Sequence, residues 1–562
     1  MKKVFSYLIF FLFLLFFSRE LSTTFEKSIT CDETVHIPAG YYYVKKGDYF
    51  INYAHPPFSK TLSGIFISKI KIFIPENIYR SLRMNEWELG MAFFYLNREY
   101  IDKIVLWARF PMILLGLLLG FFIYLWSKDL YGKTAGLFSL FLFTFCPNFL
   151  AYSCLVITDV GFTLFFIMTI YFFWRYLENQ TKKDLILTGI SFGLALSSKF
   201  SGVYVLSIIV LIFIVYGILR KKLKLDIWHY YIFSFLIIPF LVILIFYQLN
   251  LDNLKYFIIG AKRIFSETGK TGQDLFLNGK FSKTGFRSYF LWVFLYKTPI
   301  SFLVILFISF LIRPKIDRDE KFLIMPAIIY FIIASISKKQ VGGVRYILPV
   351  YALFYIFVGR IFIYNDRLKI KRVVLFFLIF WYFLVSLKIH PHYLAYFNQI
   401  CGGPDNGWKK ILNSDWGQDL ISLKDFLERE GNPEIMTNIF GVLPPEVYGI
   451  TPYEPFLYQV FMSLPEEKYH INSENPKKEY LVISVNCLAG LHYQDPDIFW
   501  YLKEKKPYAK LGYTIYVYDI TKDIKIRERI AETLEKYGYK RQAERQKRVI
   551  ENLKRKEKRN EK

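Results

Sequence analysis

Long apolar runs, separated by short basic segments, constrain the fold of this chain more than any other feature. A membrane-spanning helix needs about twenty mostly apolar residues, and eleven runs approach or reach that length. They cover residues 4–17, 104–126, 134–152, 159–177, 185–198, 202–219, 228–249, 298–312, 322–337, 347–364 and 372–388. The sequence therefore predicts a polytopic α-helical membrane protein with about eleven transmembrane helices.

The first run has the outline of a signal peptide, because Met1-Lys2-Lys3 precedes it. No pair of small residues follows it as a cleavage site; the chain continues instead with Ser18-Arg19-Glu20-Leu21. We expect a short first helix that the protein retains.

Loop charge indicates the orientation. With the N-terminus inside, every second gap between runs is short and rich in Lys and Arg, as in Arg220–Lys224 and Arg360–Arg372, which is the pattern of cytoplasmic loops. The other gaps are of mixed sign, and the two largest are 18–103 and 250–297. In this orientation, these two loops and the chain beyond residue 389 lie on the extracytoplasmic side. The sequence thus predicts a multi-pass protein of the plasma membrane. Much of the net charge of +25 is thereby loop charge, and we expect no nucleic-acid partner.

The outer loops contain shorter elements. Leu62–Ile74 and Trp87–Tyr95 are too short to span and are expected to lie in the interface as helices. The loop 250–297 includes a polar stretch, Ser266–Ser288, that could close over a site.

Beyond the membrane domain (1–388), the pattern changes to that of a small extracytoplasmic α/β domain over 389–520. Tyr480–Val485 and Tyr513–Tyr518 are typical of strands, and Asp419–Glu430 is typical of a helix. The tail, 521–562, is helical in pattern, and from Lys522 on it holds 16 Lys or Arg against 8 Asp or Glu. It is either a solvated helix or a segment drawn to anionic lipids. Of five cysteines, Cys401 and Cys487 could pair if both are outside.

Three acidic residues are candidate catalytic groups on the outer side. Asp32 and Glu33 follow the first span, and Asp159 begins the fourth. A positioned carboxylate can take the proton of an attacking hydroxyl. The alternative is structural, because Thr30 and Thr158 would cap helices whose first turns favour acids. The sequence leaves both interpretations open.

Three basic residues fall on the same face, against the charge rule: Lys60, Lys199 and Arg345. Snorkelling to the interface would explain any one of them. Three together, beside carboxylates, fit an anionic lipid headgroup, which Arg grips through two hydrogen bonds and Lys meets as a point charge.

The motifs in their order resemble glycosyltransferase family 39 and its relatives, the protein O-mannosyltransferase-like enzymes of the GT-C class. The matching motifs are Asp32-Glu33, His55-Pro56-Pro57-x-x-Lys60, Thr158-Asp159, Arg345-Tyr346-x-Leu348-Pro349, His390–Asn398, Gly402-Gly403-Pro404 and Asp415–Leu420. The resemblance covers about residues 1–420 and extends more loosely to 520.

This resemblance implies a GT-C-like fold and a transferase that takes a sugar from a polyprenyl-phosphate carrier, with inversion, and passes it to a lipid, glycan or protein acceptor. It makes Asp32 the general base, with Glu33 beside it and Asp159 as a second catalytic acid. Lys60, Arg345 and Lys199 would bind the donor phosphate. His55 and Tyr346 would position substrate. In some relatives the second acid helps to hold a divalent metal ion, so Asp32 and Asp159 are candidate metal ligands.

Two other classes of protein fit the sequence less well. A transporter or flippase of lipid-linked sugars would show repeat symmetry and charges at mid-membrane, whereas the charges here fall at the ends of spans. A receptor with an outer sensing domain would leave the acids and cations without a role. The sequence favours the transferase.

Overall fold

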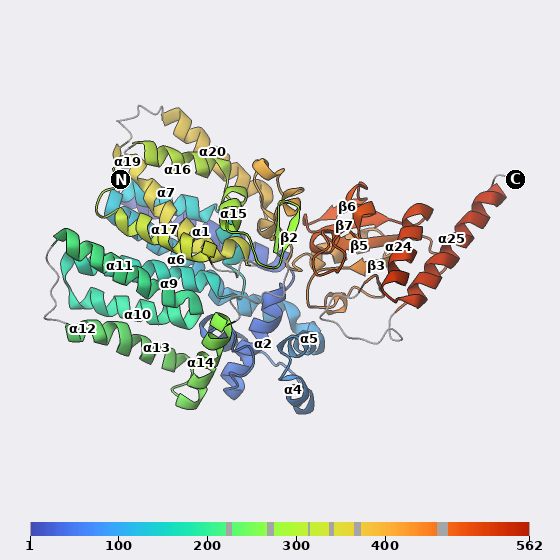
Figure 1. Ribbon diagram of the computed structural model, residues 1–562, viewed down its shortest axis with the longest axis horizontal. Helices are drawn as coiled ribbons and strands as arrows, with labels where there is room; N and C mark the ends of the chain where they lie inside the picture. The colour runs from blue at the N-terminus through green and yellow to red at the C-terminus, as the bar shows by residue number, and fades with distance from the viewer. Residues whose placement is uncertain are drawn as a thin grey trace.

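The computed structural model describes residues 2–220, 228–266, 275–312, 315–336, 342–364, 372–457 and 470–560. Figure 1 shows two parts: a large helical part that holds most of the chain, and a sheet-containing part formed by the C-terminal residues. The start of α1 (Lys2–Glu26) and the end of α25 (Lys540–Asn560) lie at opposite ends of the molecule.

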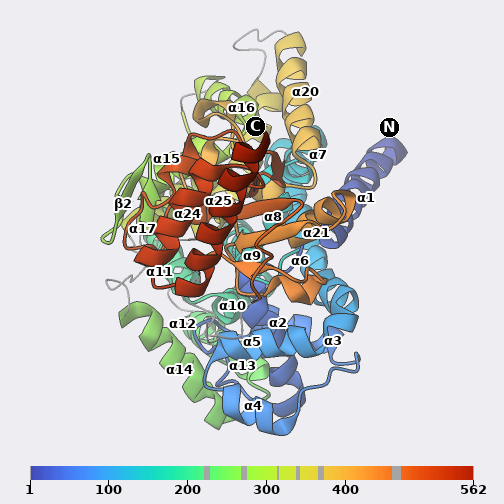
Figure 2. The same cartoon turned by 90° about the vertical axis from the view of Figure 1, so that its right-hand side faces the viewer.

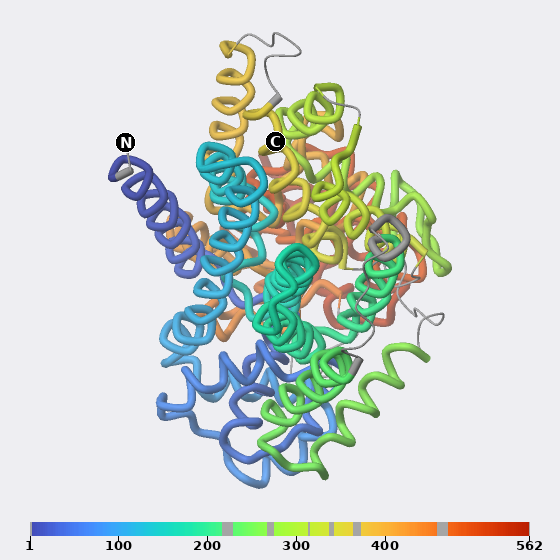
Figure 3. Tube along the Cα trace, turned by 90° about the vertical axis from the view of Figure 1, so that its left-hand side faces the viewer, coloured from blue at the N-terminus to red at the C-terminus, as the bar shows by residue number. Residues whose placement is uncertain are grey.

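Each of the eleven predicted runs lies in one or more helices. These are α1 (Lys2–Glu26), α6 (Ile101–Tyr131), α7 (Lys133–Thr144), α8 (Pro147–Tyr152), α9 (Asp159–Asn179), α10 (Lys182–Ser198), α11 (Val203–Arg220), α12 (Trp228–Ile232), η4 (Phe233–Ile237), α13 (Ile238–Phe246), α16 (Ile300–Ile312), α17 (Lys321–Ile336), η5 (Gly343–Ile347), α18 (Leu348–Phe357), η6 (Val358–Arg360), α19 (Ile361–Tyr364) and α20 (Arg372–Ile389). Helix α9 is buried along most of its length, whereas α1 and α20 are mostly exposed and project from the bundle in Figure 3.

Length and composition qualify six helices, within the described ranges, to cross a membrane. A seventh span results if α15 (Tyr289–Lys297) and α16 count as one, although the chain turns by 109° between them. Three shorter apolar helices cover 133–144, 200–215 and 321–336. The predicted fold class, a polytopic helical membrane protein, is confirmed, while the number of eleven spans stays a prediction.

The first helix is longer than the apolar run that predicted it. Arg19 and Glu20, which resemble the end of a span in the sequence, are both buried within α1. Arg19 donates a hydrogen bond from Nη2 to the Ser386 carbonyl (2.6 Å), and its guanidinium lies 5.3 Å from the centre of the Tyr393 ring. Contacts with distant residues therefore allow the helix to continue through Arg19 and Glu20, although the sequence alone predicts that the span ends there.

The predicted first outer loop (18–103) folds into α2 (Cys31–Lys46), α3 (Phe58–Ile67), α4 (Glu76–Leu82) and α5 (Glu86–Leu96). The expected helix Trp87–Tyr95 is α5. The expected helix Leu62–Ile74 is α3, which begins earlier and ends at Ile67. Helices α2 and α3 touch through their backbones, because a Cβ atom on Gly40 would lie 2.0 Å from the Lys60 carbonyl oxygen.

The second large loop contains α14 (Leu251–Ser266), the hairpin strands β1 (Leu275–Leu277) and β2 (Lys280–Ser282), and α15. Within the predicted polar stretch Ser266–Ser288, residues 267–274 lie outside the described residues. Helix α15 was not predicted, although its sequence, YFLWVFLYK, is apolar. The run is short and is followed by Thr298-Pro299, so the sequence pattern does not indicate a helix there.

The C-terminal part is an α/β domain with a five-stranded sheet in the order β4-β3-β5-β7-β6. The strands are β3 (Glu434–Asn438), β4 (Glu454–Pro455), β5 (Glu479–Ser484), β6 (Ala509–Leu511) and β7 (Ile515–Asp519). Strand β3 is parallel to β4 and β5, and β7 is antiparallel to β5 and β6. The two predicted strands are β5 and β7, and the predicted helix is α21 (Leu420–Arg429), so the α/β character is confirmed.

The tail forms α24 (Ile524–Lys536) and α25 (Lys540–Asn560), which lie together in front of the sheet domain in Figure 2. Their inner face joins the core of the domain through Ile530, Leu534 and Ala543. Arg527 and Arg545 are buried and pair with Glu479. These contacts fasten the helical tail to the sheet.

Cys401 and Cys487, which could pair if both were outside, form no disulfide with each other. The thiol of Cys401 instead donates to the Asn398 carbonyl (3.3 Å), whereas Cys487 is buried in the core of the sheet domain. The two residues belong to different cores, which sequence spacing cannot reveal.

Candidate active site

Asp32 is placed by the first turn of α2. Thr30 precedes the helix in an extended conformation, and its backbone N–H donates to Oε2 of Glu33 (3.0 Å). The structural expectation for this acidic pair, a capped helix start, is therefore confirmed for Glu33. The Asp32 carboxylate points elsewhere and remains about one quarter exposed (26%).

Four charged side chains meet at this point. Asp32 forms an ion pair with Nη1 of Arg345, and the same nitrogen lies 3.8 Å from Oδ2 of Asp159. Lys199 pairs with the other oxygen of Asp159 at 2.6 Å. The order Asp32, Arg345, Asp159, Lys199 alternates in sign, which stabilises each charge in a partly buried setting. Four of the predicted site residues are thus brought together.

Aromatic rings flank the two cations. The Lys199 ammonium lies 4.0 Å from the centre of the Tyr346 ring, and the Arg345 guanidinium lies 4.2 Å from the centre of the Trp416 ring. The buried Nε atom of Arg345 has no hydrogen-bond partner among the described residues. Because buried donors are nearly always paired in folded proteins, this nitrogen is suited to an incoming acceptor.

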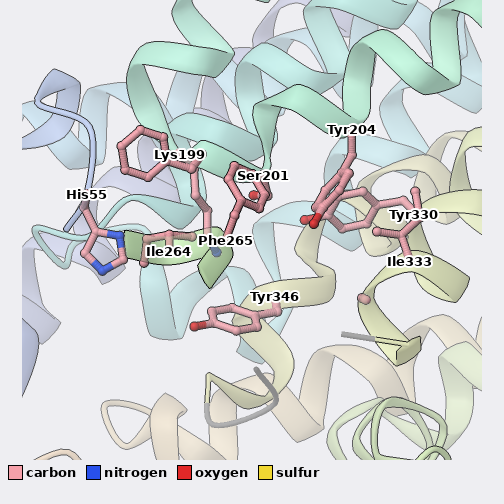
Figure 4. A pocket seen from close by; sticks show the side chains of 11 residues that line it. His55, Lys199, Ser201, Tyr204, Ile264, Phe265, Tyr330, Ile333 and Tyr346 are labelled. Carbon is pink, nitrogen blue, oxygen red and sulfur yellow. The ribbon is translucent and has the colours of Figure 1, made fainter. Parts of the chain in front are cut away.

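A cavity of about 100 Å³ opens beside these cations. Its lining comes from the first outer loop, the end of α10, and helices α11, α14, α17 and η5: His55, Lys199, Phe200, Ser201, Tyr204, Ile264, Phe265, Tyr330, Ile333, Ala334 and Tyr346. Figure 4 shows His55 and Lys199 at one end, and Tyr204, Tyr330 and Ile333 at the other. The cavity is therefore charged at one end and mostly apolar beyond it.

Two histidines lie near Asp32. His36 is one turn further along α2, and its Nδ1 atom is 2.8 Å from the Val156 carbonyl oxygen, so that nitrogen carries the proton. The rings of His36 and His55 meet edge to face at 5.6 Å. Burial lowers the pKa of His36 to about 4 and holds the pKa of His55 well below its ordinary value. Both imidazoles are therefore neutral at pH 7.

Opposing effects act on the acidity of Asp32. Burial is the largest effect and raises the pKa of its carboxyl, but the charge and hydrogen bond of Arg345, together with His36 and His55, outweigh burial and lower the pKa to about 2. The carboxylate is thus ionised at pH 7 and available as a proton acceptor, although its partner weakens it as a base.

Glu33 is buried, unlike the neighbouring Asp32. It forms an ion pair with Arg109 in which both side chains are fully buried (Nη2 to Oε2, 2.7 Å). Its Oε1 atom also accepts from the Val156 N–H (3.1 Å). Arg109 in turn donates to the carbonyls of Lys27 and Ser28, at 2.9 Å each. These contacts hold the start of α2 against α6 and the loop before α9.

Lys60 is also fully buried. Its ammonium donates to the backbone oxygen of Asn52 (2.7 Å), the side-chain oxygen of Asn52 (2.8 Å) and the His55 carbonyl (2.7 Å). Three acceptors match the three donors of an ammonium group. In these contacts Lys60 holds the loop that carries His55, and its predicted role as a phosphate ligand stays a prediction.

The predicted metal ligands, Asp32 and Asp159, do not fit a divalent ion as they lie. Arg345 bonds to Asp32 and faces Asp159, and Lys199 neutralises Asp159 as well. No cluster of three or more His, Cys, Asp or Glu side chains suited to a metal occurs in the part of the chain that the structure describes.

Sequence reasoning missed several residues around the site. Arg109, the partner of Glu33, lies within a predicted span as a charge without an assigned role. Trp416 was noted only as part of a motif, although its ring faces Arg345. A buried charge in an apolar run indicates that a partner of opposite sign exists, but the sequence does not identify it.

Comparison with known proteins defines the class. Residues 102–246 match the family model described as dolichyl-phosphate-mannose-protein mannosyltransferase. This match confirms the predicted resemblance and, with it, a multi-pass membrane glycosyltransferase related to those enzymes. The matched segment includes Asp159 and Lys199 and ends before Arg345, so the roles of single residues stay predictions. No curated protein matches the chain.

Solved structures with weak similarity include ArnT from Cupriavidus metallidurans bound to undecaprenyl phosphate, at 13% identity over 92% of this chain and 97% of that chain, with a TM-score of 0.48. The Saccharomyces cerevisiae protein O-mannosyltransferase Pmt1-Pmt2 complex bound to the sugar donor is 18% identical over 45% of this chain and 34% of that chain (TM-score 0.33). The Archaeoglobus fulgidus oligosaccharyltransferase, in complex with Zn and sulfate, is 14% identical over 67% and 52% (TM-score 0.38).

Proposed function

We propose that this membrane glycosyltransferase transfers a sugar from a polyprenyl-phosphate carrier to an acceptor hydroxyl at the extracytoplasmic face, with inversion at the anomeric carbon. The observation that carries the proposal is the charged cluster of Asp32, Arg345, Asp159 and Lys199, whose Lys199 lines one end of a mostly apolar cavity. A lipid phosphate has the same two parts, an anionic head and an apolar chain.

The donor phosphate fits the cationic end of the cavity. Lys199 lines the cavity, and Arg345 stands beside it with an unpaired Nε donor, within the described residues. A unit charge about 4 Å from a phosphate oxygen is worth roughly 4 kcal/mol at an effective dielectric near 20. Charge on the departing phosphate grows in the transition state, so these cations stabilise that state more than the bound donor.

The reaction is a single displacement. The acceptor oxygen forms a bond to the anomeric carbon as the bond from that carbon to the phosphate oxygen breaks. The hydroxyl proton passes to the Asp32 carboxylate, and the electron pair of the broken bond leaves with the polyprenyl phosphate. Asp159 orients Lys199 and Arg345 from behind.

Donor binding would also activate the base. In the free protein Arg345 holds Asp32 at a low pKa, and such a carboxylate is a poor proton acceptor. A phosphate that accepts a hydrogen bond from Arg345 shares the charge of the guanidinium, which stays between Asp32 and Asp159, and so weakens its effect on Asp32. The carboxylate then becomes more basic when a donor is present. Proton transfer to Asp32 is therefore less favourable in the absence of a donor.

Other predicted residues support this arrangement. His55 lines the cavity, and its loop is tied down by Lys60. Tyr346 covers Lys199 with its ring. Glu33 fixes the helix that carries Asp32 through its buried pair with Arg109. We therefore assign the base to Asp32 and a structural role to Glu33.

The test uses purified protein in lipid nanodiscs with a panel of polyprenyl-phosphate sugars, and the matching nucleotide sugars in parallel. Release of free polyprenyl phosphate is measured by mass spectrometry, with the Asp32→Asn variant as control. We expect release from one lipid-linked donor and little from the control. Sugar transfer from a nucleotide sugar with no lipid carrier present would overturn the proposal.

A further inference from the structure

Trp416 belongs to the C-terminal part of the chain, yet it lies against the charged cluster. It is buried (8% exposed), and its ring centre is 4.2 Å from the Arg345 guanidinium carbon. The ring of Tyr152 meets it edge to face at 5.8 Å. Trp416 therefore forms one wall of the space that Arg345 occupies.

The backbone of the same residue reaches the other member of the ion pair. The N–H of Cys31, the residue before Asp32, donates to the Trp416 carbonyl at 2.9 Å. Ser28 adds two further bonds to the segment, from its N–H to the Gln418 carbonyl (3.0 Å) and from its hydroxyl to the Gly417 carbonyl (2.9 Å). Trp416 thus contacts Arg345 through its ring and the start of α2 through its backbone.

The segment around Trp416 is held in one conformation. Its own N–H donates to the side chain of Gln418 (2.7 Å), whose amide donates back to the Ser414 carbonyl (2.8 Å). Gly417 has φ +80°, which a side chain would rarely adopt. Asp415 accepts from the Gly417 N–H at 3.1 Å. A turn closed in this way gives the indole a fixed direction.

A buried ion pair then fastens the segment to both parts of the molecule. Lys27, at the end of α1, pairs with Asp419 at 2.5 Å, and the second oxygen of Asp419 accepts from the Thr514 hydroxyl at 2.5 Å. Thr514 directly precedes β7 of the sheet domain. The C-terminal domain therefore fixes the position of Trp416 together with the segment that follows α1.

We propose that Trp416 is a positioning residue of the transferase, through which the C-terminal α/β domain holds the Arg345 guanidinium between Asp32 and Asp159. The flat face of the indole restrains the flat guanidinium by a cation–π contact. The carbonyl of Trp416, which accepts from the N–H of Cys31, fixes the backbone next to Asp32. The catalytic consequence rests on the proposed function, whereas the contact between Trp416 and Arg345 stands without it.

The test compares Trp416→Leu with Trp416→Phe, which keeps an aromatic face. Trp408→Leu is the matched control, because Trp408 is also buried in the C-terminal part but bonds to Asp405 and Tyr516. The kcat and the donor KM are measured per folded protein. We expect Trp416→Leu to lower kcat about tenfold or more with little change in KM, since misalignment acts mainly on the transition state. Trp416→Phe should restore most of kcat, and Trp408→Leu should not lower it.

Equal kcat values for Trp416→Leu and the wild type would overturn the proposal, as would a loss of folded protein with kcat per folded protein unchanged. A second measurement does not depend on activity: the melting temperatures of Trp416→Leu, Arg345→Met and the double variant. Non-additive losses support the positioning contact, and additive losses overturn it. If the wild type transfers sugar from no lipid-linked donor, the proposed function fails, and these melting temperatures alone decide the contact.

Discussion

The carboxylates of Asp32 and Asp159 face the same nitrogen atom, Nη1 of Arg345. One side comes from the first outer loop and the other from the start of a membrane helix, so a single guanidinium joins two separate elements of the site. Lys199 completes the set on the far side of Asp159. The two carboxylates differ in exposure: Asp32 is the exposed end of the cluster, and Asp159 is its buried centre.

Asp32→Asn keeps the shape of the side chain and removes the proton acceptor. We expect turnover to fall by a factor on the order of 10² or more, with normal expression and melting temperature. The measurement is release of polyprenyl phosphate per folded protein. Asp425→Asn, an exposed change in the sheet domain, is the control. Near-normal turnover in Asp32→Asn would remove Asp32 as the base.

Much of the fold could be predicted because hydropathy and helix capping are local. The apolar runs identified the helices, and Thr30 with Glu33 three residues later marked the start of α2. Helix ends were less predictable: α1 runs through Arg19 because distant groups, such as the Ser386 carbonyl, accept its hydrogen bonds. Helix α15 was hidden because a short apolar run before a proline resembles a loop.

The site could be predicted only in part, for a similar reason. The positions of Asp32, Asp159 and Arg345 on one face followed from loop parity, and the structure brings them together. Which charges pair is a matter of tertiary structure. Glu33 and Asp32 are adjacent in sequence, yet one pairs with a buried arginine of α6 and the other with Arg345.

Glu33→Gln should therefore act on stability. The change leaves the Arg109 charge buried without its counter-charge, and loss of one partner of a buried ion pair costs about 3–5 kcal/mol. We expect a clearly lower melting temperature and a lower yield of folded protein. Asp32→Asn is the comparison and should melt near the wild type. A stable Glu33→Gln protein without activity would instead indicate that Glu33 takes part in the chemistry.

Arg345→Met should change the pH dependence of the reaction. In the wild type without donor the pKa of Asp32 is about 2, so Asp32 stays ionised across an assay range of about pH 5–8 and adds no acidic limb to kcat/KM, which reports the free protein. Without Arg345, burial remains and raises the pKa of Asp32. The residual activity should then fall toward acidic pH, because the base becomes protonated. Arg98→Met, an exposed change, is the control, and an unchanged profile in Arg345→Met would contradict the role of Arg345.

The predicted topology sets Gln180 inside and the second large loop outside. Both Gln180 and Lys280 are exposed in the structure, so cysteines at these sites can be labelled. In intact cells a membrane-impermeant maleimide should react at Lys280→Cys and spare Gln180→Cys until the membrane is opened. The parent protein, in which four of five cysteines are buried, measures the background. Labelling of both sites in intact cells would refute the arrangement.

The contacts of Lys60 distinguish a loop-holding role from phosphate binding. All three of its donors are used by Asn52 and His55, and burial lowers the pKa of Lys60 to about 7. A pKa of about 7 leaves part of the Lys60 side chains as the reactive neutral amine at neutral pH, so protection from labelling must come from burial. We expect an amine-acetylating reagent to modify Lys60 slowly with or without a bound polyprenyl phosphate. Lys199, at the cavity and slightly exposed, should react in the free protein and be protected by the lipid. If Lys60 is labelled in the free protein and protected by the lipid, it is a phosphate ligand, and the loop-holding role is wrong.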